Sequence, residues 1–212
     1  MTSLRHIAPA QALETAVADA GPQAAYLDAA RACILDVGWR RTTLTEVARR
    51  AGVSRMTIYR TWKDMSAVLG DLMTREWGEV VARAVEGADG ALATDATAAD
   101  RIVAEVVATT RALRDNELFV RIVELDPELL LPYLLIRRGR SQQAIADLTA
   151  GRLRAGQADG SVRDGEPVAM ARALLLACHG FVLSRHTMVD DEVDADALDT
   201  ELEHLVRSVV SR

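Results

Sequence analysis

The sequence has few aromatic residues and few cysteines. Aromatics make up 4% of its 212 residues, while half of all residues are apolar, so Leu, Val and Ala must build a sizeable core. The two cysteines, Cys33 and Cys178, lie in apolar helical runs and fit no C-x-x-C or His/Cys ligand spacing. We therefore expect two buried free thiols in a reducing cytosol, and neither a disulfide nor a metal site.

Long apolar runs and catalytic motifs are also missing. No apolar run approaches the ~18 residues of a membrane span, and no signal-peptide pattern is present, which predicts a cytoplasmic protein. The sequence has no Gly-rich phosphate loop, no G-x-S-x-G elbow and no H-E-x-x-H motif. His179 and His186 are poorly spaced for a metal, and the acidic run 190–192 is more typical of a solvated loop. These absences argue against an enzyme and predict no metal and no cofactor.

Charge is distributed unevenly along the chain. The formal net charge is −6, which argues against a protein that coats nucleic acid indiscriminately. Residues 22–64 nevertheless contain eight basic and four acidic residues, so this segment carries +4 and the rest of the chain −10. A basic head on an acidic body is expected of a protein that binds specific DNA sites.

Hydrophobic periodicity predicts an all-α chain, because apolar residues recur at helical spacing and no segment shows strand alternation. We expect a tail over 1–21, which either frays or plays an ordering role, and a three-helix head over 22–64. A larger helical body for ligand binding and dimerisation would follow over 65–212. Within it we expect a loop over 87–97, and burial on several sides for the apolar run 129–136.

The segment from Thr43 to Trp62 predicts a helix-turn-helix. Thr43 and Glu46 fit a capping box at the start of a first helix. Gly52 suits the left-handed residue that ends this helix, and Ser54 suits the cap of a second one. Two short helices joined by such a turn can place the second helix in the major groove of DNA.

The same segment resembles the TetR family of bacterial transcriptional regulators. The resemblance covers about a quarter of the chain, and Met56 and Met65 depart from it, where the family usually has Gly and often has Lys. The matching residues are Thr42, Thr43, Val47, Ala48, Ala51, Gly52, Val53, Ser54, Thr57, Ile58, Tyr59 and Trp62.

The second helix of the motif would carry the DNA contacts. Arg55 or Arg60 can donate two hydrogen bonds to a guanine, and Met56 can press on a thymine methyl. The alternative is that the two arginines form only a solvated face. Phosphate contacts, which set register, are expected from the remaining polar residues. The predicted DNA-binding set is Thr43, Ser54, Arg55, Met56, Thr57, Tyr59, Arg60 and Lys63.

The resemblance also implies a body that binds a small effector. The surplus of apolar surface, with a few polar groups among apolar neighbours, favours a pocket for a mostly apolar ligand. For the single residues, a role in the core or an interface is the alternative reading. The candidate ligand contacts are Trp77, Val106, Thr110, Phe119, Tyr133, Arg137 and His179.

The last two long helices are candidates for a dimer interface, as two helices from each chain would form a four-helix bundle. The candidate residues are Ala177, Gly180, Phe181, Leu198, Leu202, Leu205 and Val209. The sequence thus predicts a homodimeric repressor that leaves a near-palindromic double-stranded DNA operator when its effector binds. The alternatives are a DNA-binding regulator without a ligand and a helical small-molecule-binding protein with a vestigial head.

Overall fold

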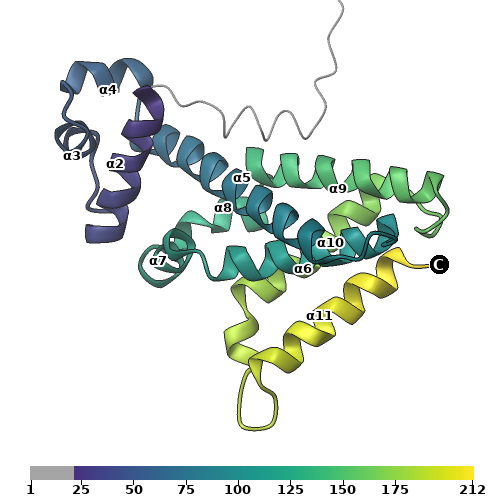
Figure 1. Ribbon diagram of the computed structural model, residues 1–212. Coiled ribbons are helices and arrows are strands. Elements are labelled where there is room, and N and C mark those ends of the chain that lie inside the picture. Colours follow the sequence, from purple (N-terminus) through teal and green to yellow (C-terminus); the bar gives the residue numbers. More distant parts are fainter. Residues whose placement is uncertain (1–21) are drawn as a thin grey trace, which may run out of the picture. The chain divides into compact units, whose positions relative to one another are not determined.

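The computed structural model describes residues 22–212, so the expectation for residues 1–21 lies outside the described part. The described chain is built of helices, as predicted, with one isolated bridge between Val162 and Ser211 (Figure 1). The α-helices are α2 (Pro22–Val37), α3 (Leu44–Arg50), α4 (Arg55–Thr61), α5 (Met65–Ala91), α6 (Ala98–Arg114), α7 (Glu117–Leu125), α8 (Leu131–Leu135), α9 (Arg140–Ala158), α10 (Pro167–Leu183) and α11 (Ala195–Val210). Short 3-10 helices, η1 (Pro127–Leu129) and η2 (Arg185–Met188), follow α7 and α10.

The chain divides into two compact units. The first unit holds the chain up to Glu79 together with Asp115–Ser141, and the second unit holds Val80–Arg114 together with Gln142–Arg212. The N-terminal half of α5 therefore belongs to the first unit and its C-terminal half to the second, so one continuous helix contributes to both.

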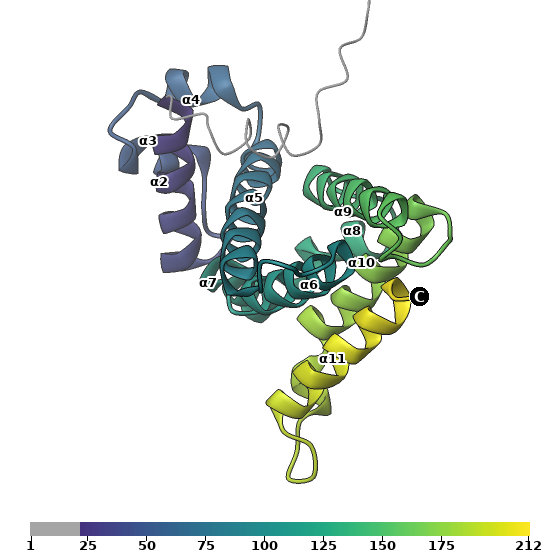
Figure 2. The same cartoon turned by 45° about the vertical axis from the view of Figure 1, so that its right-hand side comes forward.

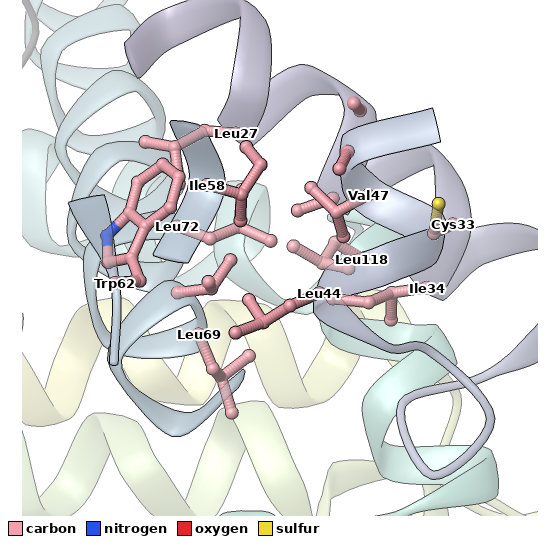
Figure 3. Close-up of a cluster of buried hydrophobic side chains, with 14 of the residues drawn as sticks. Leu27, Cys33, Ile34, Leu44, Val47, Ile58, Trp62, Leu69, Leu72 and Leu118 are labelled. Atoms are coloured by element: carbon pink, nitrogen blue, oxygen red, sulfur yellow. The ribbon is translucent and has the colours of Figure 1, made fainter. Parts of the chain in front are cut away.

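Apolar side chains from α2, α3, α4, α5 and α7 meet in the core of the first unit (Figure 3). Ile58 of α4 and Leu72 of α5 are fully buried there, and Leu118 brings α7 against the same cluster. The ring of Tyr26 meets Trp62 edge-on, with 6.3 Å between centroids, and the indole N–H of Trp62 donates to Asp71 Oδ2 at 2.7 Å. This packing fixes the two motif helices to α2 and α5.

Local hydrogen bonds confirm most of the predicted helix signals. The Thr43 hydroxyl accepts from the Glu46 amide at 3.2 Å, and the Ser54 hydroxyl accepts from the Thr57 amide at 3.1 Å. Gly52 has φ +67°, the left-handed value expected at the end of α3. The predicted capping box is wrong in one half, because the Glu46 carboxylate binds the Arg49 guanidinium instead of an end amide.

A long-range contact holds the turn between α2 and α3. Asp126, at the end of α7, accepts from the Trp39 amide at 2.9 Å and lies 3.3 Å from the Arg40 guanidinium. Gly38, at φ +82°, allows the chain to turn here, and a Cβ at this position would lie 3.2 Å from the Leu125 side chain. A contact across nearly ninety residues therefore orients the start of the helix-turn-helix.

Two expectations for the rest of the chain are wrong. Residues 87–91 are not a loop but the last turn of α5, because its helical hydrogen bonding continues through Gly87 and Gly90. The run 129–136 is not buried on several sides: α8 is only five residues long, and Leu135 and Ile136 are 77% and 82% exposed. Only Leu129 and Leu130 of this run pack on the first core.

The second unit has its own core, built from α6, α9, α10 and α11 (Figure 2). Ile102, Leu153, Leu174 and Leu202 are almost completely buried in it. Gly156 allows the close approach of Val162, because a Cβ on this glycine would lie 2.3 Å from the valine side chain.

A buried carboxylate joins three segments of the second unit. Asp199 of α11 is 4% exposed and lies within 3.3 Å of three guanidinium groups. These belong to Arg111 and Arg114 at the end of α6 and to Arg185 of η2. Burial alone would raise the pKa of Asp199, but the hydrogen bonds and charges of these arginines hold it below the usual value.

Candidate nucleic-acid interface and ligand cavity

The second motif helix, α4, presents hydrogen-bonding and apolar side chains to the surface. Its inner side is anchored by Ile58, which is completely buried, whereas Arg55, Met56, Tyr59 and Arg60 are exposed. The side chain of Met56 is 70% exposed, so the outer face of α4 carries an apolar group among its hydrogen-bonding side chains. Of the other predicted DNA contacts, Thr43, Ser54 and Lys63 are exposed, and Thr57 is half-buried and hydrogen-bonded to Ser54.

Some arginines of residues 22–64 form ion pairs within the chain, whereas others do not. Arg40 binds Glu128, Arg49 binds Glu46 and Arg50 binds Asp36, and Arg31 binds Glu76 and Glu117. Among the described residues, no acidic side chain pairs with Arg41, Arg55 or Arg60. The two arginines of α4 are therefore free to donate to a nucleic acid without first breaking an internal ion pair.

An apolar cavity lies within the second unit, between α5, α6, α9 and α10. It encloses about 60 Å³, and its wall is formed mainly by aliphatic side chains such as Val81, Leu113, Ile145 and Leu174. A pocket for a drug-sized ligand normally holds ~300–1,000 Å³. A ligand of that size could enter only if the side chains of the wall moved apart.

Two charged side chains line this cavity, Glu105 of α6 and Arg152 of α9. The Arg152 Nε lies 2.8 Å from Glu105 Oε2, but its N–H makes no aligned hydrogen bond. Glu105 is only 6% exposed, and its second oxygen, Oε1, has no hydrogen-bond partner among the described residues. Burial raises the pKa of Glu105 to about 7, and nearby Asp89 also raises it, against the opposing charges of Arg152 and Arg101.

This pKa predicts a specific pH dependence of stability. The unfolded chain releases the Glu105 proton near 4.5, whereas the folded chain retains it up to about 7. The unfolding free energy contributed by this group therefore falls as the pH rises from 4.5 to 7, by about 3 kcal/mol at most. We expect Glu105→Gln to remove this fall. The unfolding free energy of the variant, measured by urea denaturation, should therefore rise relative to that of the wild type between pH 5 and pH 8.

A matched control is Glu86→Gln, because Glu86 is an exposed acid on α5. Its stability should keep the wild-type pH dependence. Parallel pH profiles for the wild type and Glu105→Gln would show that the carboxyl titrates as an ordinary solvated group.

The predicted ligand contacts are divided between the two units. Val106 and Thr110 line the cavity of the second unit, and the Thr110 hydroxyl donates to the Val106 carbonyl at 2.7 Å. Trp77 and Phe119 belong to the first unit, where their rings pack edge-on with 5.6 Å between centroids. Tyr133 and Arg137 also belong to the first unit, with the guanidinium 5.3 Å from the ring centroid.

His179 lies in the second unit next to the cavity-lining Cys178, and its Nε2 is 3.3 Å from the side-chain nitrogen of Gln142. Burial lowers the pKa of His179 and raises the pKa of the Cys178 thiol. Both cysteines are free thiols, and Cys33 is buried in the first core. The described residues contain no group of three or more His, Cys, Asp or Glu placed to hold a metal ion.

Sequence reasoning missed Glu105 and Arg152. The available signal was an acid between Ile102 and Val106, on a helix whose other inward positions are apolar. Its partner lies 47 residues further along the chain, so the pair could not be recognised from local spacing.

The predicted dimer residues lie on α10 and α11 with different exposures. Gly180 and Leu205 are exposed, and Ala177, Phe181, Leu198 and Val209 are half-buried. Leu202 is completely buried in the core of its own chain, so it cannot meet a partner directly. Leu176 was not predicted, yet it is 71% exposed on α10.

The exposed α4, held by a turn against α2 and α3, together with the helical second unit, defines a helix-turn-helix DNA-binding protein. The model of the family "Bacterial regulatory proteins, tetR family" matches residues 27–72. An uncharacterised HTH-type transcriptional regulator of Mycobacterium tuberculosis is 35% identical over 179 residues, covering 84% of this chain and 88% of the relative. The chain belongs to the TetR family and is a transcriptional regulator rather than an enzyme.

Solved structures share the fold at low sequence identity. The TetR-family repressor QsdR of R. erythropolis is 16% identical, with a TM-score of 0.65 over 90% of this chain and 96% of that one. FadR from Bacillus subtilis, solved in complex with stearoyl-CoA, is 20% identical, with a TM-score of 0.59 over 88% of this chain and 98% of that one. The SmeT–triclosan complex is 22% identical, with a TM-score of 0.57 over 90% of this chain and 92% of that one. Among the described helices, none is long and apolar enough to cross a membrane.

Proposed function

We propose that the protein is a homodimeric repressor that leaves a near-palindromic operator when a small, mostly apolar molecule enters the cavity of the second unit. The observation that carries the proposal is this cavity, which has an aliphatic wall and two buried polar atoms without hydrogen-bond partners. Two similar structures, FadR with stearoyl-CoA and SmeT with triclosan, contain small molecules, and QsdR and SmeT are named as repressors. The site of action would be the cytoplasm, where bacterial DNA is found.

The small volume of the cavity determines how a ligand would exert control. A ligand can shift an equilibrium only if it binds one arrangement better than another. A drug-sized molecule is much larger than the cavity of about 60 Å³, so it would bind an expanded arrangement better than the described one. Expansion would displace the C-terminal half of α5, which lines the cavity with Val81 and Val85. The same helix begins directly after the DNA-binding motif, with its first turn capped by Asp64.

The test is a thermal-shift screen followed by operator release. Compounds that stabilise the full chain are titrated against a complex with an operator selected from random DNA. We expect the best ligands to weaken operator binding by at least tenfold, which corresponds to the ~1–3 kcal/mol typical of coupling between sites. Ligands that bind but leave operator affinity unchanged would contradict control by this cavity.

The same small volume favours a second candidate, a DNA-binding regulator that takes no ligand. In that case the cavity is only a packing defect, and no compound should stabilise the chain. A vestigial head is disfavoured by α4. Its Arg55 and Arg60 are exposed and pair with no described acidic residue, so both remain available to contact DNA.

The proposed dimer uses the exposed faces of α10 and α11. Leu176 on α10 and Leu205 on α11 supply exposed apolar surface, and Gly180 permits close backbone approach. A Cβ added at Gly180 would meet nothing within 4 Å in its own chain. The glycine therefore offers free space to a second copy of the chain.

We expect Gly180→Leu to convert the dimer to a monomer without unfolding the chain. The leucine fits its own subunit and removes a helix-interior glycine, which gains up to ~1 kcal/mol in helix propensity. In a close dimer the same side chain overpacks the interface and costs ~1–3 kcal/mol or more. Analytical ultracentrifugation at micromolar concentration measures the change.

The control is Gly87→Leu, at a position of α5 where an added Cβ likewise meets nothing within 4 Å. It should sediment as the wild type does. A wild-type monomer, or a Gly180→Leu dimer of unchanged affinity, would contradict the interface and the palindromic operator with it.

A further inference from the structure

The second unit contains two buried carboxylates that differ in their number of hydrogen-bond partners. Asp199 is surrounded by three guanidinium groups, and its hydrogen bonds from Arg111 and Arg114 are 2.8–3.3 Å long. Glu105 is as deeply buried but contacts only Arg152, and its Oε1 accepts no hydrogen bond from a described residue. A buried polar atom without a hydrogen-bond partner destabilises the folded state, so its retention needs an explanation.

The unpartnered atoms of this pair are complementary. Glu105 Oε1 is a free acceptor, and the Arg152 Nε–H is a free donor, although the two side chains lie 2.8 Å apart. Both residues line the same cavity, but side chains cover both atoms, so a ligand reaches them only when the wall of the cavity moves apart. A group that both donates and accepts a hydrogen bond would satisfy the two atoms together.

The charge of the pair selects against ionic ligands. Above pH 7, Glu105 is ionised and neutralises the charge of Arg152, and the remaining wall is mostly aliphatic. An ammonium group would compete with Arg152 for the carboxylate, and a carboxylate group would face Glu105. Either ion would leave one buried charge uncompensated, which is strongly unfavourable in an apolar site.

We propose that Glu105 and Arg152 form the polar end of the ligand site, and that the ligand is an apolar molecule with one uncharged amide-like group. This group donates to Glu105 Oε1 and accepts from Arg152 Nε, while the apolar part lies among the aliphatic residues of α5, α6, α9 and α10. The inference rests on the proposed ligand control, since it assigns the chemistry of the molecule that this cavity takes. Because burial raises the pKa of Glu105 to about 7, the ligand is tested at pH 8, where the carboxyl is ionised and its oxygens accept hydrogen bonds.

The experiment is calorimetric titration of the full chain with four eight- or nine-carbon probes. Octanamide donates and accepts, nonan-2-one only accepts, octanoate is an anion and octylammonium is a cation. In the wild type we expect octanamide to bind at least tenfold more tightly than each of the others. An unsatisfied buried partner costs enough to produce such a ratio.

Variants show whether the pair produces this preference. We expect Glu105→Leu and Arg152→Leu each to weaken octanamide binding about tenfold. Glu105→Leu should change nonan-2-one binding much less, because this probe has no group that donates to Glu105. If a single variant fails to fold, Glu105→Leu/Arg152→Leu removes both charges together and leaves no unpaired arginine. The matched control is Arg154→Leu, an exposed arginine two residues along α9, which should bind every probe as the wild type does.

Several outcomes would overturn the inference. These are octanoate or octylammonium binding as tightly as octanamide, an octanamide preference that persists without Glu105, and no measurable binding of any probe. The titration contains no DNA, so it is independent of operator release. Selective octanamide binding without release of the operator would uphold the recognition chemistry and contradict only the proposed control.

Discussion

Asp199→Ala is expected to cost the folded protein about 3–5 kcal/mol, the usual effect of removing one partner from a buried ion cluster. Arg114 and Arg185 are mostly buried, and both lose their acidic partner in this variant. Three guanidinium groups would then lie close together without the Asp199 carboxylate between them. Urea denaturation followed by circular dichroism measures the loss.

Asp196→Ala is the control for this prediction, because Asp196 is an exposed acid in the first turn of the same helix. It should cost less than about 1 kcal/mol, the size of a helix-dipole effect. If Asp199→Ala costs no more than the control, the cluster is a surface arrangement with no structural role.

Arg55→Ala/Arg60→Ala is expected to abolish sequence-specific operator binding. An arginine that reads a base contributes ~1–3 kcal/mol, so the pair contributes roughly 2–6 kcal/mol, a loss of about 30-fold to 10⁴-fold. Both side chains are exposed on α4, and neither pairs with an acidic residue in the part of the chain that the structure describes. Electrophoretic mobility shifts with selected operator and with random DNA separate specific from non-specific binding.

The matched control removes two arginines elsewhere, Arg154→Ala on α9 and Arg101→Ala on α6, and lowers the net charge equally. It should change operator affinity little, since neither belongs to the helix-turn-helix unit. Unchanged operator binding in both Arg55→Ala and Arg60→Ala would show that α4 is not the recognition helix.

The head was predictable because its signals are local. The Thr43 and Ser54 caps and the positive φ of Gly52 each follow from residues within three positions. Asp64 caps α5 by the same rule, accepting from the Ala67 amide at 2.8 Å. Such hydrogen bonds depend on the chain nearby and are therefore readable from sequence.

The site in the second unit was less predictable because its contacts cross the chain. Glu105 meets Arg152, and Asp199 meets Arg111, through packing that no local pattern records. The apolar run at α8 misled for a related reason: apolar composition indicates where burial is possible, while a helix of five residues can bury only one side. The aromatic candidates also fell outside the cavity, since Trp77 pairs with Phe119 in the first unit and neither residue lines it.

The placement of the aromatic rings has a spectroscopic consequence. All three tryptophans of the sequence, Trp39, Trp62 and Trp77, belong to the first unit, as do the three tyrosines. Intrinsic fluorescence and near-ultraviolet absorption therefore report on the DNA-binding unit alone, and Phe181 is the only aromatic residue of the second unit. An emission change caused by a ligand held in the second unit would therefore arise at tryptophans that do not line the cavity.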